Sequence, residues 1–310
     1  MSLIEKIRAK ARANVMRIVL PEGDEPRTVA AAEIVRREGI AEPILLTPER
    51  MRERASEYAE LLYSLRKAKG LSKEDAAKLV ADPMYYGILM VKAGDADALV
   101  SGAVHATVEM LRPALQIIKT KPGMKLVSCS LIMECPDTSF GENGVLVCSD
   151  CVVNPCPDAE ELANIAVAAA ETARTLCGIA EPRVAMLSFS TRGSASHELV
   201  TKVQQATEMA HALAPDLLLD GEMQLDAALV KDAAERKAPG SPVAGRANVL
   251  VFPDLQSGNI GYKIAQRLGG VTCFATLQGL AKPCNDLSRG CSVDEVVNTI
   301  AITAVQAQGF

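Results

Sequence analysis

The densest group of potentially reactive side chains in this 310-residue chain lies near its C-terminus, in residues 282–292 (KPCNDLSRGCS). Ser288 and Arg289 are adjacent there, and a hydroxyl beside a guanidinium can hold a phosphate or stabilise a developing oxyanion. Asn285 adds a polar group able to contact a ligand. Ser292 and Glu295 also form the Ser-x-x-Glu pattern of a helix N-terminus. Glu295 can therefore serve local folding, chemistry or both.

A second polar group follows an apolar run at residues 183–188 and precedes an expected helix. It combines hydroxyls, a glycine and Arg192. Such a turn offers backbone N–H groups and a helix N-terminus to an anion. The alternative is a polar loop with a serine cap. The candidate anion-binding residues are Ser190, Thr191, Gly193 and Ser194.

Three carboxylates follow the next apolar run, at Asp220, Glu222 and Asp226. They could bind a divalent metal or act as acid and base. Acidic residues at the start of a helix, where they complement its dipole, account for them equally well.

A third polar turn spans residues 253–263, where Gly258 and Gly261 permit close approach of a ligand to the backbone. A helix N-terminus with a lysine nearby can bind an anion. The candidate binding residues of this turn are Asn259, Tyr262 and Lys263.

Several common site types have no support in this sequence. It contains no Gly-x-Gly-x-x-Gly fingerprint, no Walker sequence and no Gly-x-Ser-x-Gly elbow. One Cys-x-x-Cys pair, at Cys148 and Cys151, has no partner pair, so we expect no metal site. Of the histidines, His105 could line a cleft, whereas His211 is expected on a helix surface.

The composition and the apolar runs argue against several kinds of partner and location. The net charge is −5, aromatic residues make up 3% and tryptophan is absent, so nucleic-acid and anionic-lipid partners are not expected. The N-terminal stretch lacks the apolar region of a signal peptide, and no apolar run is long enough to span a bilayer. Nine irregularly spaced cysteines, an odd number, are typical of a reduced cytoplasmic protein.

Short apolar runs alternate with helical patterns, which predicts an α/β fold with parallel sheets covered on both faces. Expected strands are residues 17–20, 43–46, 98–102, 125–134, 145–153, 183–188, 216–219, 247–252 and 271–274. Expected helices are residues 25–38, 48–94 with breaks at Gly70 and Asp82, 108–119, 158–176, 196–214, 224–237, 258–268 and 292–308. We expect residues 1–122 plus 280–310 to form one discontinuous domain and residues 123–279 an inserted second one.

Six segments, in this order, resemble the phosphate acetyltransferases (phosphotransacetylases) of the phosphate acetyl/butyryltransferase family, in their short single-module form. They are residues 100–105 (VSGAVH), 111–116 (LRPALQ), 150–155 (DCVVNP), 220–224 (DGEMQ), 259–263 (NIGYK) and 282–290 (KPCNDLSRG). The resemblance implies two three-layer parallel-sheet domains, like those of isocitrate and isopropylmalate dehydrogenases, with a cleft between them. It also implies a homodimer.

The same resemblance implies the reaction acetyl-CoA + phosphate = acetyl phosphate + CoA, by direct thiolate attack in a ternary complex. CoA and acetyl-CoA are then co-substrates, with no tightly bound cofactor and no metal. By analogy, Ser288 donates to the oxyanion and Arg289 holds the phosphoryl group. Glu295, with Asp294 beside it, matches the position of the base. The arginines that match CoA-associated positions are Arg66 and Arg112.

Three other functions stay open. Phosphate butyryltransferase is the sister activity, because acyl length cannot be inferred from spacing. A metal- and NAD(P)-dependent dehydrogenase of the same fold would use Asp220, Glu222 and Asp226 as ligands. A non-catalytic binding subunit is the third, although the Ser288-Arg289 pair argues against it.

Overall fold

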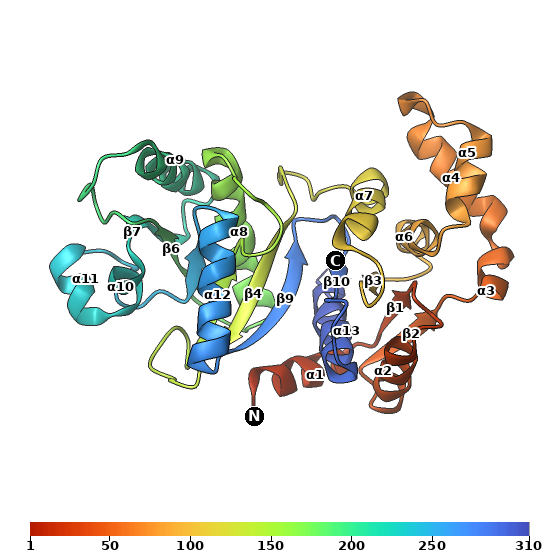
Figure 1. Ribbon diagram of the computed structural model, residues 1–310, viewed down its shortest axis with the longest axis horizontal. Coiled ribbons are helices and arrows are strands. Elements are labelled where there is room, and N and C mark those ends of the chain that lie inside the picture. The colour runs from red at the N-terminus through yellow and green to blue at the C-terminus, as the bar shows by residue number, and fades with distance from the viewer. Residues whose placement is uncertain (310) are drawn as a thin grey trace. The chain divides into compact units, whose positions relative to one another are not determined.

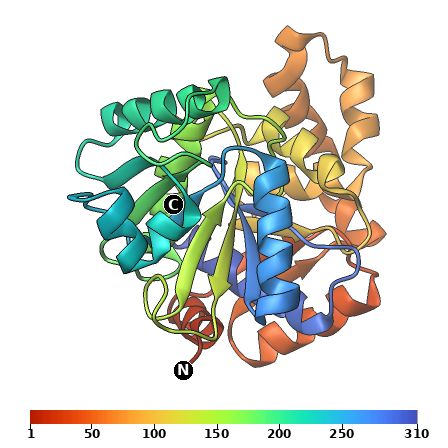
Figure 2. The same ribbon diagram turned by 60° about the vertical axis from the view of Figure 1, so that its left-hand side comes forward.

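The computed structural model describes residues 1–309, which form two compact units. Unit 1 is Met1–Pro122 together with the chain from Leu280 onward, and unit 2 is Gly123–Gly279. Each unit is built on its own β-sheet with helices packed against it (Figure 1, Figure 2). The expected α/β class is confirmed by this alternation of strands and helices.

The sheet of unit 1 has four parallel strands in the order β10-β3-β1-β2. The strands are β1 Met16–Leu20, β2 Ala41–Leu45, β3 Ala98–Ser101 and β10 Cys284–Asp286. Ile18, Val19 and Leu99 are fully buried at the centre of this sheet. Because all strands run in one direction, the loops that follow them meet at one edge of the sheet, where parallel sheets bind ligands.

Helices cover both faces of this sheet. One face packs against α2 and α13 and the other against α6 (Figure 1). The expected helix breaks are present, since Gly70 adopts a left-handed conformation (φ 86°) and Asp82 caps the helix that begins at Pro83. The helices of unit 1 are α1 Leu3–Ala13, α2 Pro26–Arg37, α3 Pro48–Glu53, α4 Ala55–Arg66, α5 Lys73–Val80, α6 Pro83–Ala93, α7 Thr107–Ile117 and α13 Val293–Ala307, with the 3-10 turn η1 Lys67–Lys69.

Unit 2 contains a six-stranded sheet in the order β7-β6-β8-β5-β4-β9. The strands are β4 Ser128–Glu134, β5 Val145–Ser149, β6 Arg183–Leu187, β7 Leu218–Met223, β8 Val249–Val251 and β9 Thr272–Gln278. The helices are α8 Ala159–Thr175, α9 Glu198–Leu213, α10 Leu225–Leu229, α11 Lys231–Lys237 and α12 Leu255–Gly269. One apolar cluster joins α8 and α9 to the sheet, and a second joins α10 and α12, which gives three layers.

Three details differ from the sequence-based expectation. The helix expected at 224–237 is divided at Val230, whose extended backbone separates α10 from α11. In unit 2, β4 runs antiparallel to both neighbours, because a loop without a helix joins β4 to β5 and such a connection reverses the chain. In unit 1, residues 284–286 form an edge strand within a segment that we expected to be a turn. Asn and Asp are depleted in strands, so only the pairing with β3 makes this segment extended.

Candidate active site

The strand ends of unit 1 bring three segments together: Glu22 after β1, residues 102–105 after β3, and residues 287–290 after β10. β3 pairs with both β1 and β10, so the middle segment lies between the other two. Leu287 N donates to Ser101 O at 2.8 Å, which continues the pairing beyond β10. This edge therefore holds Ser288 and Arg289, the pair singled out in the sequence.

The Glu22 carboxylate occupies the centre of the loop 102–105. It accepts hydrogen bonds from the backbone N–H groups of Gly102 (3.1 Å), Ala103 (2.9 Å), Val104 (2.9 Å) and His105 (2.9 Å). The imidazole Nδ1 of His105 lies 2.9 Å from the same carboxylate. Burial opposes ionisation of Glu22, but these hydrogen bonds outweigh it and hold the pKa below its usual value. The loop is thus built around an internal anion.

Arg27 joins this loop to the segment that carries Ser288 and Arg289. Its guanidinium donates to the carbonyl oxygens of Arg289 (2.8 Å), Cys291 (2.9 Å) and Ala103 (2.9 Å). Glu25 orients it through a 2.6 Å bond to Nε. A planar guanidinium with several donors in fixed directions suits this bridging. The two loops are therefore held in one arrangement by a residue that the sequence analysis did not single out.

Ser288 and Arg289 are both exposed at this edge. The Ser288 hydroxyl oxygen accepts from Gly290 N at 3.3 Å, which leaves its proton available to a ligand. Only the backbone carbonyl of Arg289 is engaged, and its guanidinium has no hydrogen-bond partner among residues 1–309. The arrangement offers a free cation beside a free hydroxyl donor, which suits a phosphoryl group and a developing oxyanion.

Asp286 ends β10, two residues before this pair. Its carboxylate binds the Thr107 hydroxyl through Oδ2, while Oδ1 is buried and has no hydrogen-bond partner within residues 1–309. Burial raises the pKa of Asp286 to about 6, and nearby Glu22 adds to that shift against the opposing bond from Thr107. Gly102 (φ 110°) has no Cβ, and a Cβ there would clash with this carboxylate and with the Leu287 backbone.

The two acidic candidates for the base have partners of their own. Glu295 completes the expected capping box, accepting from Ser292 N at 2.6 Å while its own N–H donates to the Ser292 hydroxyl. Asp294 is ion-paired with Arg8 of α1 at 2.5 Å. Both carboxylates help to hold the start of α13.

Asn285 is fully buried and points away from solvent. Its amide donates to the Thr303 hydroxyl at 2.8 Å and to Gln306 Oε1 at 2.6 Å, both on α13. Through these bonds Asn285 holds β10 against α13.

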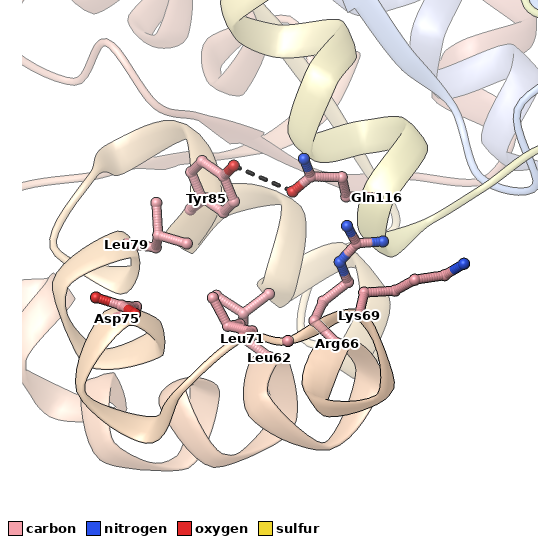
Figure 3. Close-up of a pocket in the computed structure, with 9 residues that line it drawn as sticks. Leu62, Arg66, Lys69, Leu71, Asp75, Leu79, Tyr85 and Gln116 are labelled. Carbon is pink, nitrogen blue, oxygen red and sulfur yellow. Dashed lines mark hydrogen bonds between the residues drawn. The ribbon is translucent and has the colours of Figure 1, made fainter.

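A pocket of about 260 Å³ lies elsewhere in unit 1, among α4, α5, α6 and α7 (Figure 3). Arg66 and Lys69 supply positive charge at its wall, and Tyr85 donates to Gln116 across it at 3.2 Å. Burial raises the pKa of Tyr85, and the charges of Arg112 and Arg66 oppose that rise, which places both guanidiniums close to this ring. Neither guanidinium has a hydrogen-bond partner within residues 1–309. Of the two arginines that the resemblance singled out, Arg66 thus lines the pocket, and the charge of Arg112 acts on Tyr85 in its wall.

In unit 2, the predicted anion-binding loop also surrounds an internal carboxylate. Glu222 of β7 accepts from Gly193 N at 2.7 Å, from the Ser190 hydroxyl at 2.8 Å and from the Gln204 amide at 3.0 Å. Ser190 is completely buried, whereas Ser194 is exposed. The Ser190 hydroxyl and the Gly193 N–H of this loop are therefore directed at Glu222.

Thr191 is buried in the same loop. Its hydroxyl accepts from Gln224 N at 3.0 Å, and its N–H donates to the Ser194 hydroxyl at 3.0 Å. These bonds tie the loop to the end of β7.

The other two carboxylates of the possible metal triad are bonded separately. Asp220 pairs with Arg192 at 2.8 Å and accepts from Ser241, and Asp226 pairs with Lys237 at 2.6 Å. Within residues 1–309, no three His, Cys, Asp or Glu side chains are grouped so that they could hold a metal ion. The dehydrogenase alternative thus lacks its assembled ligand set in this part of the chain.

Asn259, Tyr262 and Lys263 lie on α12. Asn259 donates to the Cys151 carbonyl at 3.2 Å, and Tyr262 packs at the rim of the second apolar cluster. The Lys263 ammonium lies 5.2 Å from the centre of the Tyr262 ring. Of the three, Lys263 is the exposed group.

The cysteines nearest the motifs are Cys151, Cys284 and Cys291, and all three are buried. Burial raises the pKa of each thiol, to about 12 for Cys284. Buried neutral thiols are poor nucleophiles, so an acyl-cysteine mechanism has no support from these three residues.

Sequence reasoning did not single out Glu22, Arg27 or Asp286 as site residues. Glu22 had one signal, because a carboxylate directly after a buried strand is a strand-end residue of a parallel sheet. Arg27 and Asp286 gain their importance from partners far away in the sequence.

Among residues 1–309, no helix combines the length and the apolar character that crossing a membrane requires. Residues 2–304 match the model of the family described as phosphate acetyl/butaryl transferase. The phosphate acetyltransferase of Thermoanaerobacterium thermosaccharolyticum is 57% identical to this chain, over 99% of the chain and 100% of that relative.

Solved structures agree with this similarity. The crystal structure of a phosphotransacetylase from Streptococcus pyogenes is similar with a TM-score of 0.94 at 46% identity, over 100% of both chains. A putative 4-hydroxythreonine-4-phosphate dehydrogenase from Salmonella typhimurium is similar with a TM-score of 0.55 at 9% identity, over 95% of this chain and 99% of that one. The second likeness concerns the fold alone and agrees with the dehydrogenase-like fold expected.

Proposed function

This chain belongs to the phosphate acetyl/butaryl transferase family, and from that premise we propose that it transfers an acetyl group reversibly between coenzyme A and inorganic phosphate. One observation carries the proposal. The exposed Arg289 guanidinium and the Ser288 hydroxyl lie side by side in sequence at a parallel strand edge, and both keep free donors.

The reaction is a direct displacement at the acetyl carbonyl. The CoA sulfur attacks the carbonyl carbon of acetyl phosphate, the carbonyl oxygen becomes an oxyanion, and the bond to the phosphate oxygen then breaks. Ser288 donates to the oxyanion, a contribution worth about 2.7–4 kcal/mol of barrier for one such donor in other enzymes. Arg289 holds the phosphoryl group, which a guanidinium can do through two parallel bonds. Positioning both substrates together supplies much of the remaining acceleration.

Coenzyme A is proposed to bind in unit 1 at the pocket beside Arg66 and Arg112. Its phosphate groups need cations, and both guanidiniums and Lys69 lie at or near this pocket. No cofactor other than this co-substrate enters the proposal.

For the candidate residues of unit 2, the proposed roles follow from their hydrogen bonds and from which of them are exposed. Ser190, Thr191 and Gly193 shape their loop through bonds to Glu222 and Gln224, and Ser194 presents an exposed hydroxyl for phosphate. Lys263 supplies an exposed cation on α12, with Asn259 and Tyr262 anchoring that helix.

Three candidate site residues, Glu295, Asp294 and Asn285, make bonds that support α13. That Glu295 or Asp294 takes the thiol proton stays a prediction, and the cap and the ion pair account for both side chains without it. Asn285 is proposed as a positioning residue for α13 instead of a substrate contact.

A homodimer is proposed through α12. Ile260, Ile264 and Leu268 are 56%, 54% and 84% exposed and recur at four-residue intervals, so they line one side of the helix. An exposed apolar stripe of this kind marks an interaction surface. In the six-stranded sheet of unit 2, β9 is an edge strand, and its neighbour within residues 1–309 is β4.

A cytoplasmic location is also proposed. All nine cysteines are unpaired, which agrees with a reducing, cytoplasmic location.

The proposal is tested by arsenate-driven breakdown of acetyl-CoA and butyryl-CoA, with EDTA present. We expect acetyl-CoA turnover that EDTA leaves unchanged and that Arg289→Ala lowers about a hundredfold or more, as for loss of one transition-state donor. Arg37→Ala, an exposed arginine on α2, serves as the matched control and should keep full activity. Preference for butyryl-CoA would assign the sister activity, and absence of turnover with both would reject the transferase.

A further inference from the structure

The Glu22–His105 pair has a geometry that the roles assigned so far do not use. The imidazole Nδ1 lies 2.9 Å from Glu22 Oε1, and the same carboxylate accepts four backbone N–H groups of the loop. Glu22 is 5% exposed, whereas the side chain of His105 is 31% exposed. The pair thus consists of a buried carboxylate and a histidine that reaches solvent.

The hydrogen bonding determines which imidazole nitrogen carries the proton. Four backbone N–H groups donate to the Glu22 carboxylate and lower its pKa against the effect of burial, so it is ionised and acts only as an acceptor. Nδ1 of His105 must therefore donate to it. In the neutral ring this leaves the lone pair on Nε2, which has no hydrogen-bond partner among residues 1–309. A carboxylate oriented in this way prepares an imidazole to accept a proton at Nε2.

The position of the loop brings this nitrogen to the reactive edge. Arg27 donates to Ala103 O, two residues before His105, and to Arg289 O, on the loop that carries Ser288. β3 and β10, which end in these two loops, are neighbours in the sheet. The imidazole therefore belongs to the same sheet edge as the groups proposed to hold the oxyanion and the phosphate.

The charges around the pair come from several elements. Arg27 and Glu25 stand at the start of α2 and Asp286 on β10, and the Arg27 and Asp286 charges both act on Glu22. On α7, the Glu109 carboxylate is occupied by the Ala106 N–H at 2.6 Å. Arg27 thus faces the carboxylates and leaves Nε2 unengaged.

We infer that His105, in place of Glu295 or Asp294, takes the proton from the CoA thiol through Nε2 and delivers it to the departing phosphate. This inference rests on the proposed function. The thiol S–H bond breaks as Nε2 gains the proton, and the sulfur electron pair forms the C–S bond. The C–O bond to phosphate then breaks, and the leaving phosphate oxygen receives the proton from Nε2. Acetyl phosphate and CoA become acetyl-CoA and hydrogen phosphate, and His105 returns to its neutral form.

The chemistry suits a histidine. Free thiols have a pKa near 8.5, so only a few per cent are thiolate at neutral pH, and a base is required. A histidine can both accept and return a proton in this range.

The test uses His105→Asn in the full chain. The Asn amide can occupy the place of Nδ1 and donate to Glu22, so the loop keeps its bond while Nε2 is lost. We expect kcat to fall by about 10²–10⁴, with KM for CoA within about threefold of wild type. His211→Asn, on the exposed side of α9, is the matched control and should change neither constant.

A second variant separates proton transfer from a structural role. His105→Gly should recover activity in proportion to added imidazole, and hydrogen exchange of amides 102–105 should stay protected in His105→Asn. The inference is overturned if His105→Asn keeps wild-type kcat, or if neither variant is active and imidazole restores nothing. It is also overturned if adding Glu295→Gln to the His105→Gly variant removes the activity that imidazole restores. If the wild type itself transfers no acetyl group, the proposed function fails, which is a separate result.

Discussion

Replacement of Glu22 by glutamine is expected to destabilise unit 1 strongly while changing a single atom. Oε1 accepts from Val104 N, His105 N and His105 Nδ1, and Oε2 accepts from Gly102 N and Ala103 N. Whichever oxygen the amide nitrogen replaces, at least two N–H donors lose their acceptor and face another donor. The loop 102–105 then keeps only part of its support.

The magnitude follows from the number of lost bonds. A hydrogen bond to a charged group contributes about 1.5–3 kcal/mol, so two lost bonds destabilise the fold by about 3–6 kcal/mol. Typical domains are stable by about 5–15 kcal/mol, so the variant should be marginal. The pKa of Glu22 is lowered in the folded state, so this stabilisation is present above the unfolded pKa near 4.3 and is lost as the pH falls through the folded value.

Guanidinium chloride unfolding at pH 7, together with hydrogen exchange of amides 102–105, measures this effect. The exchange of these amides should rise in Glu22→Gln well before global unfolding. Glu33→Gln, an exposed position on α2, is the control and should lie within about 0.5 kcal/mol of wild type. A Glu22→Gln variant within about 1 kcal/mol of wild type, with unchanged exchange at 102–105, would refute the reasoning.

Three further predictions follow from the same structure. Asp286 has a pKa of about 6 in the folded state, so the native state keeps its proton to higher pH than the unfolded state does, and stability falls as the pH rises from about 4 to 6. Asp286→Asn should remove roughly 2–3 kcal/mol of that pH dependence in thermal melts. An unchanged dependence of stability on pH in this variant would contradict the prediction. Asn285→Ala should lower stability to urea by about 1–3 kcal/mol without changing KM for CoA, whereas a tenfold rise in KM would indicate substrate contact. Ile264→Asp on α12 should halve the mass measured by light scattering, and an unchanged mass would exclude this helix from the dimer interface.

Local patterns in the sequence sufficed for the α/β class and for most elements. The run at 17–20 became β1, and the capping box expected of Ser292 and Glu295 begins α13. The first and last residues of a helix depend on neighbours three or four residues away, so they can be predicted from one sequence. The resemblance further identified Ser288 and Arg289, which the structure leaves exposed with free donors.

Local patterns could not predict whether a strand-end loop binds a ligand or encloses a side chain of the protein itself. The sequence indicated that residues 190–194 form an anion-binding turn, and the structure fills that turn with the carboxylate of Glu222. The loop 102–105 encloses Glu22, which lies about eighty residues earlier in the chain. Backbone N–H groups need an acceptor, but whether a ligand or a distant side chain supplies it depends on how remote segments pack.

The sequence by itself determined the class of fold, the capped helices and the position of the Ser288-Arg289 pair, because these features depend on residues close together in the chain. The tertiary structure alone decided that Arg27 joins two loops, that Asn285 turns inward to α13, and that Glu22 orients His105. Each of these depends on hydrogen bonds between segments far apart in sequence, and only the pairing of parallel strands in one sheet brings those segments together.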